Sequence, residues 1–142
     1  MHRASVPLHL LKLAVGIDDL DDLCRTRAMR AAERGGHWVP TRNYPRRAAE
    51  IVDGGSLYWV VRGRIAARQS VAGFRSRHDA AGRRYCLIDV DSELVPTVPR
   101  ACRAFQGWRY LPATLAPPDR ISAVEEPPSD RMLAELRALG LI

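Results

Sequence analysis

The chain has 142 residues and a net charge of +6, and 46% of its residues are hydrophobic against 27% charged. This length and balance are typical of one folded domain, and they exclude a disordered chain or a long apolar membrane-spanning stretch. Lys12 is the only lysine, so arginine supplies nearly all of the positive charge. The bias has two explanations, which the sequence leaves open: the codon usage of a GC-rich genome, or a surface that attracts polyanions.

Cysteine usage argues against a disulfide framework and against a zinc site. The three cysteines, Cys24, Cys86 and Cys102, are far apart, form no CxxC pair and have no histidine cluster beside them. The first 16 residues lack the long apolar region and the small-residue cleavage site of a secretory signal. We therefore expect a cytoplasmic protein without a cofactor and without a membrane partner.

The first half of the chain predicts a strand and two helices. Alternating leucines indicate a strand over residues 6–15 that ends at Gly16. A helix follows to about residue 34, with Asp18 as its N-cap and further aspartates in its first turn, where negative charge is favourable. Its inner face would consist of Leu20, Leu23, Cys24, Ala28 and Ala31. A second helix over residues 46–53 would follow Pro45.

Residues 56–91 predict a β-hairpin with many arginines. In one extended strand, alternate residues face opposite sides. The predicted core face holds Leu57, Trp59, Val61, Gly63, Ile65, Ala67 and Val71. The predicted outer face holds Tyr58, Arg62, Arg64 and Arg68. Residues 77–84 would form the loop, with Gly82 at positive φ, and residues 85–91 the returning strand with Cys86, Ile88 and Val90 inward.

The remaining chain is interrupted by prolines and ends in an amphipathic stretch. Residues 103–111 interleave aromatic and basic side chains and predict a last strand or ordered loop. Five prolines between residues 112 and 128 indicate an extended connection. A final helix over residues 129–140 would carry one apolar stripe of Met132, Leu133, Leu136 and Leu139.

Together these elements predict a single α+β domain over residues 1–142. Its centre would be a small mixed sheet, mostly antiparallel, that is curved or closed into a pseudo-barrel and flanked by two to three helices.

The pattern of basic and aromatic residues favours RNA, or another polyanion, as the partner. Arginine forks bind phosphate and aromatic rings stack on bases, so a sheet face carrying both suits single-stranded or structured RNA. The predicted contact residues are Tyr58, Arg62, Arg64, Arg68, Arg103, Trp108 and Arg109. The alternative is that these arginines only solvate the outer face of a half-buried sheet.

Two further functions remain as alternatives. Asp89, Asp91 and Glu93 stand at alternate positions, and on one strand face they would suit a metal-dependent hydrolase or nuclease. The apolar stripe of residues 129–140 would suit a protein-interaction adaptor or a homo-oligomer. No sequence motif identifies a catalytic residue or a metal ligand. His78 and Asp79 are not a catalytic pair, because neighbouring side chains on a strand point apart.

Four segments resemble domain-of-unknown-function family 1489, a set of small alphaproteobacterial proteins. They are PLHLLKLAVG (7–16), DGGSLYWVVRG (53–63), ELVPTVPRACRAFQGWRYL (93–111) and APPD (116–119). The resemblance implies a bacterial cytoplasmic setting and no catalytic residue. Residues 53–64 also resemble PUA-like domains, the pseudo-barrels that include ASCH and EVE modules. That second resemblance would imply recognition of RNA or of a modified base.

Overall fold

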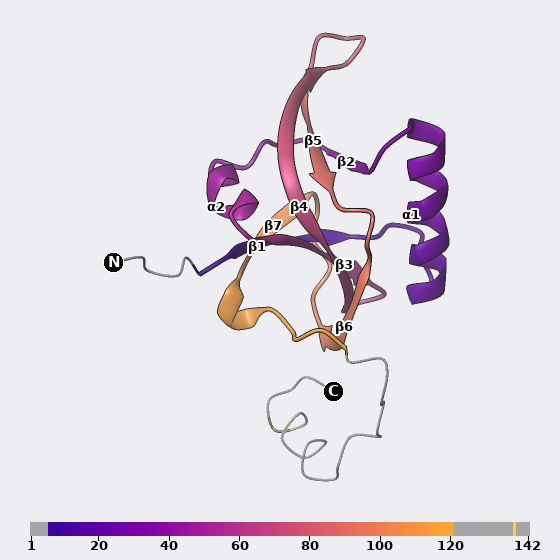
Figure 1. Ribbon diagram of the computed structural model, residues 1–142, viewed down its shortest axis with the longest axis vertical. Coiled ribbons are helices and arrows are strands. Elements are labelled where there is room, and N and C mark those ends of the chain that lie inside the picture. Colours follow the sequence, from indigo (N-terminus) through magenta and orange to yellow (C-terminus); the bar gives the residue numbers. More distant parts are fainter. Residues whose placement is uncertain (1–5, 121–137, 139–142) are drawn as a thin grey trace.

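A computed structural model describes residues 6–120 and Ala138 (Figure 1). The helices are α1 (Leu20–Arg34), α2 (Ala48–Val52) and the short 3-10 helix η1 (Ala113–Leu115). The strands are β1 (Leu8–Leu13), β2 (Trp38–Thr41), β3 (Ser56–Val61), β4 (Arg64–His78), β5 (Arg84–Val90), β6 (Val95–Ala101) and β7 (Trp108–Pro112).

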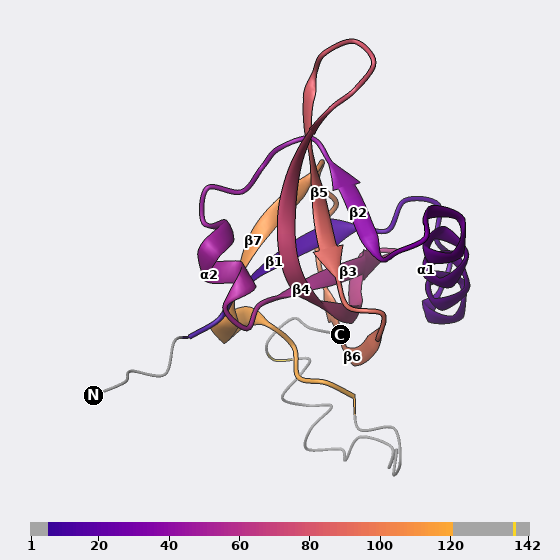
Figure 2. The ribbon, with the colours of Figure 1, turned by 45° about the horizontal axis from the view of Figure 1, so that its top comes forward.

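The strands form one sheet in the order β2-β5-β4-β3-β1-β7, and β6 pairs with β4 beside this path. β1 and β3 are parallel, and all other pairs of strands are antiparallel. The 15 residues of β4 are enough for it to pair with β3, β5 and β6 in turn. Figures 1 and 2 show this long curved strand running through the molecule, with α1 and α2 on opposite sides of it. The predicted α+β class with a curved, mostly antiparallel sheet is confirmed.

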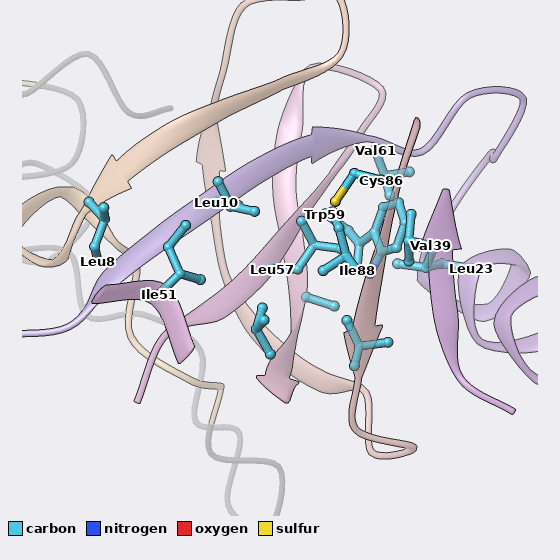
Figure 3. Close-up of a cluster of buried hydrophobic side chains, with 13 residues drawn as sticks. Leu8, Leu10, Leu23, Val39, Ile51, Leu57, Trp59, Val61, Cys86 and Ile88 are labelled. Atoms are coloured by element: carbon cyan, nitrogen blue, oxygen red, sulfur yellow. The ribbon is translucent and has the colours of Figure 1, made fainter. Parts of the chain in front are cut away.

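β3 lies at the centre of the sheet and is buried on both faces. Its six residues, SLYWVV, are all buried, as expected for an apolar run covered from both sides. Leu57, Trp59 and Val61 belong to the larger core cluster, which Figure 3 shows between β1, β3, β5 and the two helices. Tyr58 and Val60 point the other way, into a second cluster with Leu11, Ile65 and Leu111. The fold therefore has two cores with β3 between them.

The single alternating face predicted from Leu57 to Val71 is wrong. Arg62 and Gly63 both have positive φ, 47° and 77°, and they form a two-residue turn between β3 and β4. The chain therefore reverses at this point, and Ile65 pairs with Val60 and enters the second core. A bulge at Ala66 then returns Ala67 to the larger core. A turn and a bulge thus replace what the sequence suggested was one continuous strand.

Helix α1 packs differently from its prediction. The N-cap is Asp19, one residue later than expected, and its carboxylate accepts from the backbone N–H of Asp22 at 2.8 Å. Only Leu23 of the helix is buried, and the expected inner residue Cys24 is exposed. Two arginines, Arg27 and Arg34, face inward instead, and both donate to the carbonyl of Trp38. The second helix, α2, is also shorter than the predicted residues 46–53.

The β4–β5 hairpin projects beyond the body of the molecule (Figures 1 and 2). Residues 76–84, which we call the arm, are all exposed. At its tip the backbone N–H of Asp79 donates to the carbonyl of Arg83 at 2.9 Å, and Gly82 has φ 80°. The Asp79 carboxylate accepts from the N–H groups of Ala81 and Arg83 and so fixes the turn. The positive φ of Gly82 is confirmed, but the loop is shorter than the predicted residues 77–84, because β4 continues to His78 and β5 begins at Arg84.

The chain after β7 returns to β6. Thr97 and Asp119 form a bridge, and the N–H of Val98 donates to Pro118 at 2.9 Å. The predicted connection over residues 112–128 is thus ordered and paired as far as residue 120. The predicted helix over residues 129–140 lies outside the described residues, apart from Ala138. In the described part of the chain, no helix is both long and apolar enough to cross a membrane.

Candidate nucleic-acid interface

The seven residues predicted to contact RNA do not form one surface. Tyr58 and Arg68 are cross-strand partners on β3 and β4, and they line a pocket. Arg62, Arg64 and Arg103 lie around the β3–β4 turn. Trp108 and Arg109 are neighbours on β7 and therefore point to opposite faces of it.

Tyr58 is a core residue rather than a surface contact. Its side chain belongs to the second core, with the whole residue only 4% exposed, and its ring makes an edge contact with His9 at 5.0 Å. Burial raises the pKa of its hydroxyl above the ordinary value. Arg68 lies opposite it and donates two hydrogen bonds to Asp119, from Nε to Oδ1 and from Nη2 to Oδ2, each at 2.7 Å. This hydrogen-bonded pair lowers the pKa of Asp119 and keeps both groups charged.

The pocket beside this pair has a volume of about 370 Å³. Polar side chains from β1, β3, β4 and the segment after η1 converge on it: His9, Ser56, Tyr58, Arg68, Ser70 and Asp119. The residues of 113–118 that complete its wall are alanines and prolines. No single stretch of sequence predicts this site, because its members are separated by up to 110 residues.

His9 is neutral in this pocket. Its Nδ1 accepts from the backbone N–H of Ser56 at 2.9 Å, so the neutral ring carries its proton on Nε2. Burial, with a contribution from the positive charge of Arg68, lowers the pKa of His9 below its usual 6.5. The partner of His9, Ser56, is 47 residues away in the chain and reaches it only because β1 and β3 pair.

Arginines gather around the β3–β4 turn. Arg62 is exposed and pairs with Asp18 at 2.7 Å, and Arg64 is exposed beside it. The N–H of Cys102 donates to the carbonyl of Gly63 at 2.8 Å, which brings the exposed Arg103 next to this turn. Arg62, Arg64 and Arg103, which we call the turn cluster, are thus the part of the predicted interface that the fold does bring together.

The two predicted contacts on β7 divide between the faces of the sheet. Trp108 packs against the larger core, and its indole Nε1 donates to the carbonyl of Asn43 at 2.7 Å. Arg109 is exposed and stacks over the ring of Phe105, with 5.4 Å between the guanidinium carbon and the ring centroid. Of the two, Arg109 remains available to a ligand.

The arm is a basic feature that the predicted site left out. Arg77, Arg83 and Arg84 are exposed on it, and the described residues provide no ion-pair partner for any of the three side chains. Its one acidic residue, Asp79, is engaged in the turn. Tyr85 is half-buried opposite Arg77, so a ring stands beside the arginines. The sequence signal for an exposed arm is the run from Ser76 to Arg84, which holds no large apolar residue.

Helix α1 adds further positive charge near β2. Arg27 and Arg34 both donate to the carbonyl of Trp38, at 3.1 and 2.7 Å, and Arg27 also stacks over the Trp59 ring at 5.1 Å. Burial lowers the pKa of Arg27 to about 10, with repulsion from Arg34 and Arg30 adding to the shift. These arginines serve as the packing face of the helix.

The three carboxylates of the alternative metal site do not share one strand, because β5 ends at Val90. Asp89 lies in β5 and takes three hydrogen bonds from Arg75, the shortest at 2.6 Å, and Asp91 and Glu93 follow the strand in exposed positions. Within residues 6–120 there is no group of three or more acidic, histidine or cysteine side chains arranged to hold a metal ion.

Burial raises the pKa of the Cys86 thiol to about 11, so this cysteine is a protonated core residue at neutral pH.

The described fold defines a small α+β protein with a curved sheet, a polar pocket and a projecting basic hairpin. A family described as "Protein of unknown function (DUF1489)" matches residues 10–142, and the chain belongs to this family. The match reaches residue 142, beyond the segments that carried the resemblance in the sequence. No curated protein and no solved structure matches the chain.

Proposed function

We propose that this protein binds nucleic acid, with RNA as the target, and that the arm is its principal contact. The observation that carries the proposal is the exposed hairpin with three arginines, Arg77, Arg83 and Arg84, that have no ion-pair partner in the described part of the chain. A two-stranded ribbon that stands free of its domain can lie along the phosphates of a folded RNA and beside its unpaired bases.

The chemistry of the arm supports phosphate recognition. Arginine presents a planar fork that binds phosphate oxygens, and its guanidinium is always charged. Tyr85 stands opposite Arg77 and offers a partly exposed ring on which a base can stack. The net charge of +6 adds a field that attracts polyanions at longer range. Such contacts are largely independent of sequence, as expected for binding through the backbone.

A PUA-like pseudo-barrel is the finer fold that we propose for this function. Its support is the return of the chain after β7, because the N–H of Arg120 donates to Pro96 and the N–H of Val98 to Pro118. These bonds connect the end of the β4-β3-β1-β7 series back to β6, which itself pairs with β4. The second core would then fill the interior of the ring. Superposition of an experimental structure on PUA-like domains tests this assignment.

The test compares two matched double variants. Arg83→Glu/Arg84→Glu changes the arm, and Arg62→Glu/Arg64→Glu makes the same change of charge in the turn cluster, where the sequence placed the contact. Affinity for a mixed pool of structured RNA is measured at fixed salt, with duplex DNA of the same length as comparison. Circular dichroism checks that each variant folds.

We expect the arm variant to lose at least tenfold in affinity, about 1.4 kcal/mol, and the turn variant to lose much less. A loss confined to the turn variant would move the interface to the turn cluster and overturn the role of the arm. A clear preference for duplex DNA would overturn RNA as the target. If the wild-type protein binds neither nucleic acid, the proposed function is wrong.

A further inference from the structure

We infer that the pocket lined by His9, Tyr58, Arg68 and Asp119 binds the planar amide edge of a small neutral ligand, such as the lactam edge of a uracil base. This inference is independent of the arm, since the pocket lies on β1, β3, the first half of β4 and the segment of residues 113–119. Two of its residues, Tyr58 and Arg68, were predicted on the outer face of the sheet.

The pocket presents hydrogen-bond donors and acceptors next to one another. The neutral His9 ring has its Nδ1 occupied by Ser56, so its remaining polar atom, Nε2–H, is a donor. Each carboxylate oxygen of Asp119 takes one bond from Arg68 and keeps a second lone pair. Tyr58 and Ser70 also line the pocket, and a hydroxyl can act in either role.

The net charge of the lining selects a neutral ligand. Arg68 and Asp119 cancel one another as a bidentate pair, and His9 is uncharged. An added anion would face the carboxylate of Asp119, and an added cation would face Arg68 and its positive field. A neutral group avoids both repulsions and still satisfies the polar atoms that it covers.

A planar amide fits the arrangement of these atoms. Its N–H donates to the free lone pair of Asp119, and its C=O accepts from His9 Nε2–H or from a remaining N–H of Arg68. The volume of about 370 Å³ is within the range of small-ligand sites and is sufficient for one nucleobase. Ser56, Tyr58 and Arg68 stand on the paired strands β3 and β4, and two hydrogen bonds from Arg68 position Asp119 beside them.

The same edge occurs in free small amides and in bases of RNA, and a titration with defined probes distinguishes the sources. The full chain, labelled with ¹⁵N, is titrated with uridine, 3-methyluridine, nicotinamide and a short oligouridylate. Methylation of N3 removes the N–H while keeping the ring and the carbonyls, so 3-methyluridine is the matched control. We expect uridine to shift the amide signals of residues 9, 56, 58 and 119, with at least tenfold weaker binding of 3-methyluridine.

If nicotinamide binds more tightly than uridine, the amide edge is that of a free small molecule. Tighter binding of the oligouridylate supports a base of RNA. Equal responses to uridine and to 3-methyluridine overturn the inference, as does the absence of any shift with all four probes.

Two variants keep the test separate from the proposed function. Asp119→Ala removes the acceptor oxygens on an exposed segment, and Tyr58→Phe removes the hydroxyl of a residue that lines the pocket. We expect at least tenfold weaker uridine binding in the first and a smaller loss in the second. The arm variant Arg83→Glu/Arg84→Glu should bind uridine as the wild type does. Unchanged uridine affinity in Asp119→Ala would overturn the inference, whatever the arm does to RNA.

Discussion

The buried amide of Gln69 is a sensitive test of how β4 is held in place. Gln69 is only 1% exposed and lies on the core side of β4, while its neighbours Arg68 and Ser70 face the pocket. Its Oε1 accepts from the indole Nε1 of Trp59, and its Nε2 donates to the carbonyl of Asp91, both at 2.9 Å. One side chain therefore connects β4 to the central strand and to the end of β5.

The change Gln69→Leu leaves the buried indole N–H of Trp59 without a partner and removes the donor from the part-buried carbonyl of Asp91. The unpaired indole costs about 1–3 kcal/mol and the second hydrogen bond about 0.5–1.5 kcal/mol. The more apolar leucine offsets this by about 1–2 kcal/mol of transfer free energy. From the midpoints of these ranges we expect a net loss of about 1.5 kcal/mol in the free energy of unfolding, measured by urea denaturation with circular dichroism.

A double-mutant cycle with Trp59→Phe isolates the hydrogen bond. Phenylalanine removes the indole N–H, so in the double variant no donor is left unpaired at this position. We expect the two single losses to exceed the double loss by at least about 0.5–1 kcal/mol. Losses that add to within about 0.5 kcal/mol would refute the claim that Gln69 acts through Trp59.

Two further predictions concern stability. The pKa of His9 is lowered from 6.5, so as the pH falls below 6.5 the unfolded chain takes up a proton that the folded chain does not. The free energy of unfolding should then fall by up to about 1.4 kcal/mol per pH unit until the pH passes the pKa of His9 in the folded protein. His9→Gln should remove this dependence. Equal pH profiles of stability for the variant and the wild type would contradict the prediction. A Cβ at Gly55 would lie 2.1 Å from the carbonyl oxygen of Leu8. Gly55→Ala should therefore lower the free energy of unfolding by about 3 kcal/mol or more. Gly54→Ala should lower it by about 1–2 kcal/mol, because there only the positive φ is unfavourable. Similar thermal midpoints for the two variants would show that the backbone at Gly55 shifts to make room for the Cβ.

Local signals in the sequence predicted the elements well. The aspartates before α1, the glycines after it and the alternation in β5 correspond to a cap, a stop and a half-buried strand in the structure. The loop of the arm was predicted from Gly82 because only a few residue types adopt positive φ at low cost. In each case the cause lies within a few residues of its effect.

The candidate site was predicted less well because it depends on tertiary pairing. The two-residue turn places an arginine, Arg62, at φ 47°, where turn preferences favour glycine or asparagine, so the reversal had no clear signal. Without the turn, Tyr58 and Arg62 were assigned to one face, although Tyr58 lies in the second core. The ion pair of Arg68 with Asp119 joins residues 51 positions apart, and composition gives no indication of it.

The position of the charges illustrates the same limit. Of the arginines predicted on the outer face of β4, Arg64 is exposed, whereas Arg68 is half-buried and paired with Asp119. Pairing with β3 and β6 occupies the first half, whereas the second half extends with β5 alone as the arm. Which half is free is decided by the order of strands in the sheet, and that order is a property of the whole chain.

The salt dependence of RNA binding tests the central claim most directly. Each phosphate contact contributes about 0.7 on a single strand and about 0.9 on a duplex to the slope of log affinity against log salt concentration. The variant Arg83→Ser/Arg84→Ser should therefore have a slope that is shallower by up to about 1.4–1.8, with the turn variant Arg62→Ser/Arg64→Ser close to the wild type. Identical slopes for the arm variant and the wild type would contradict binding of phosphates through the arm.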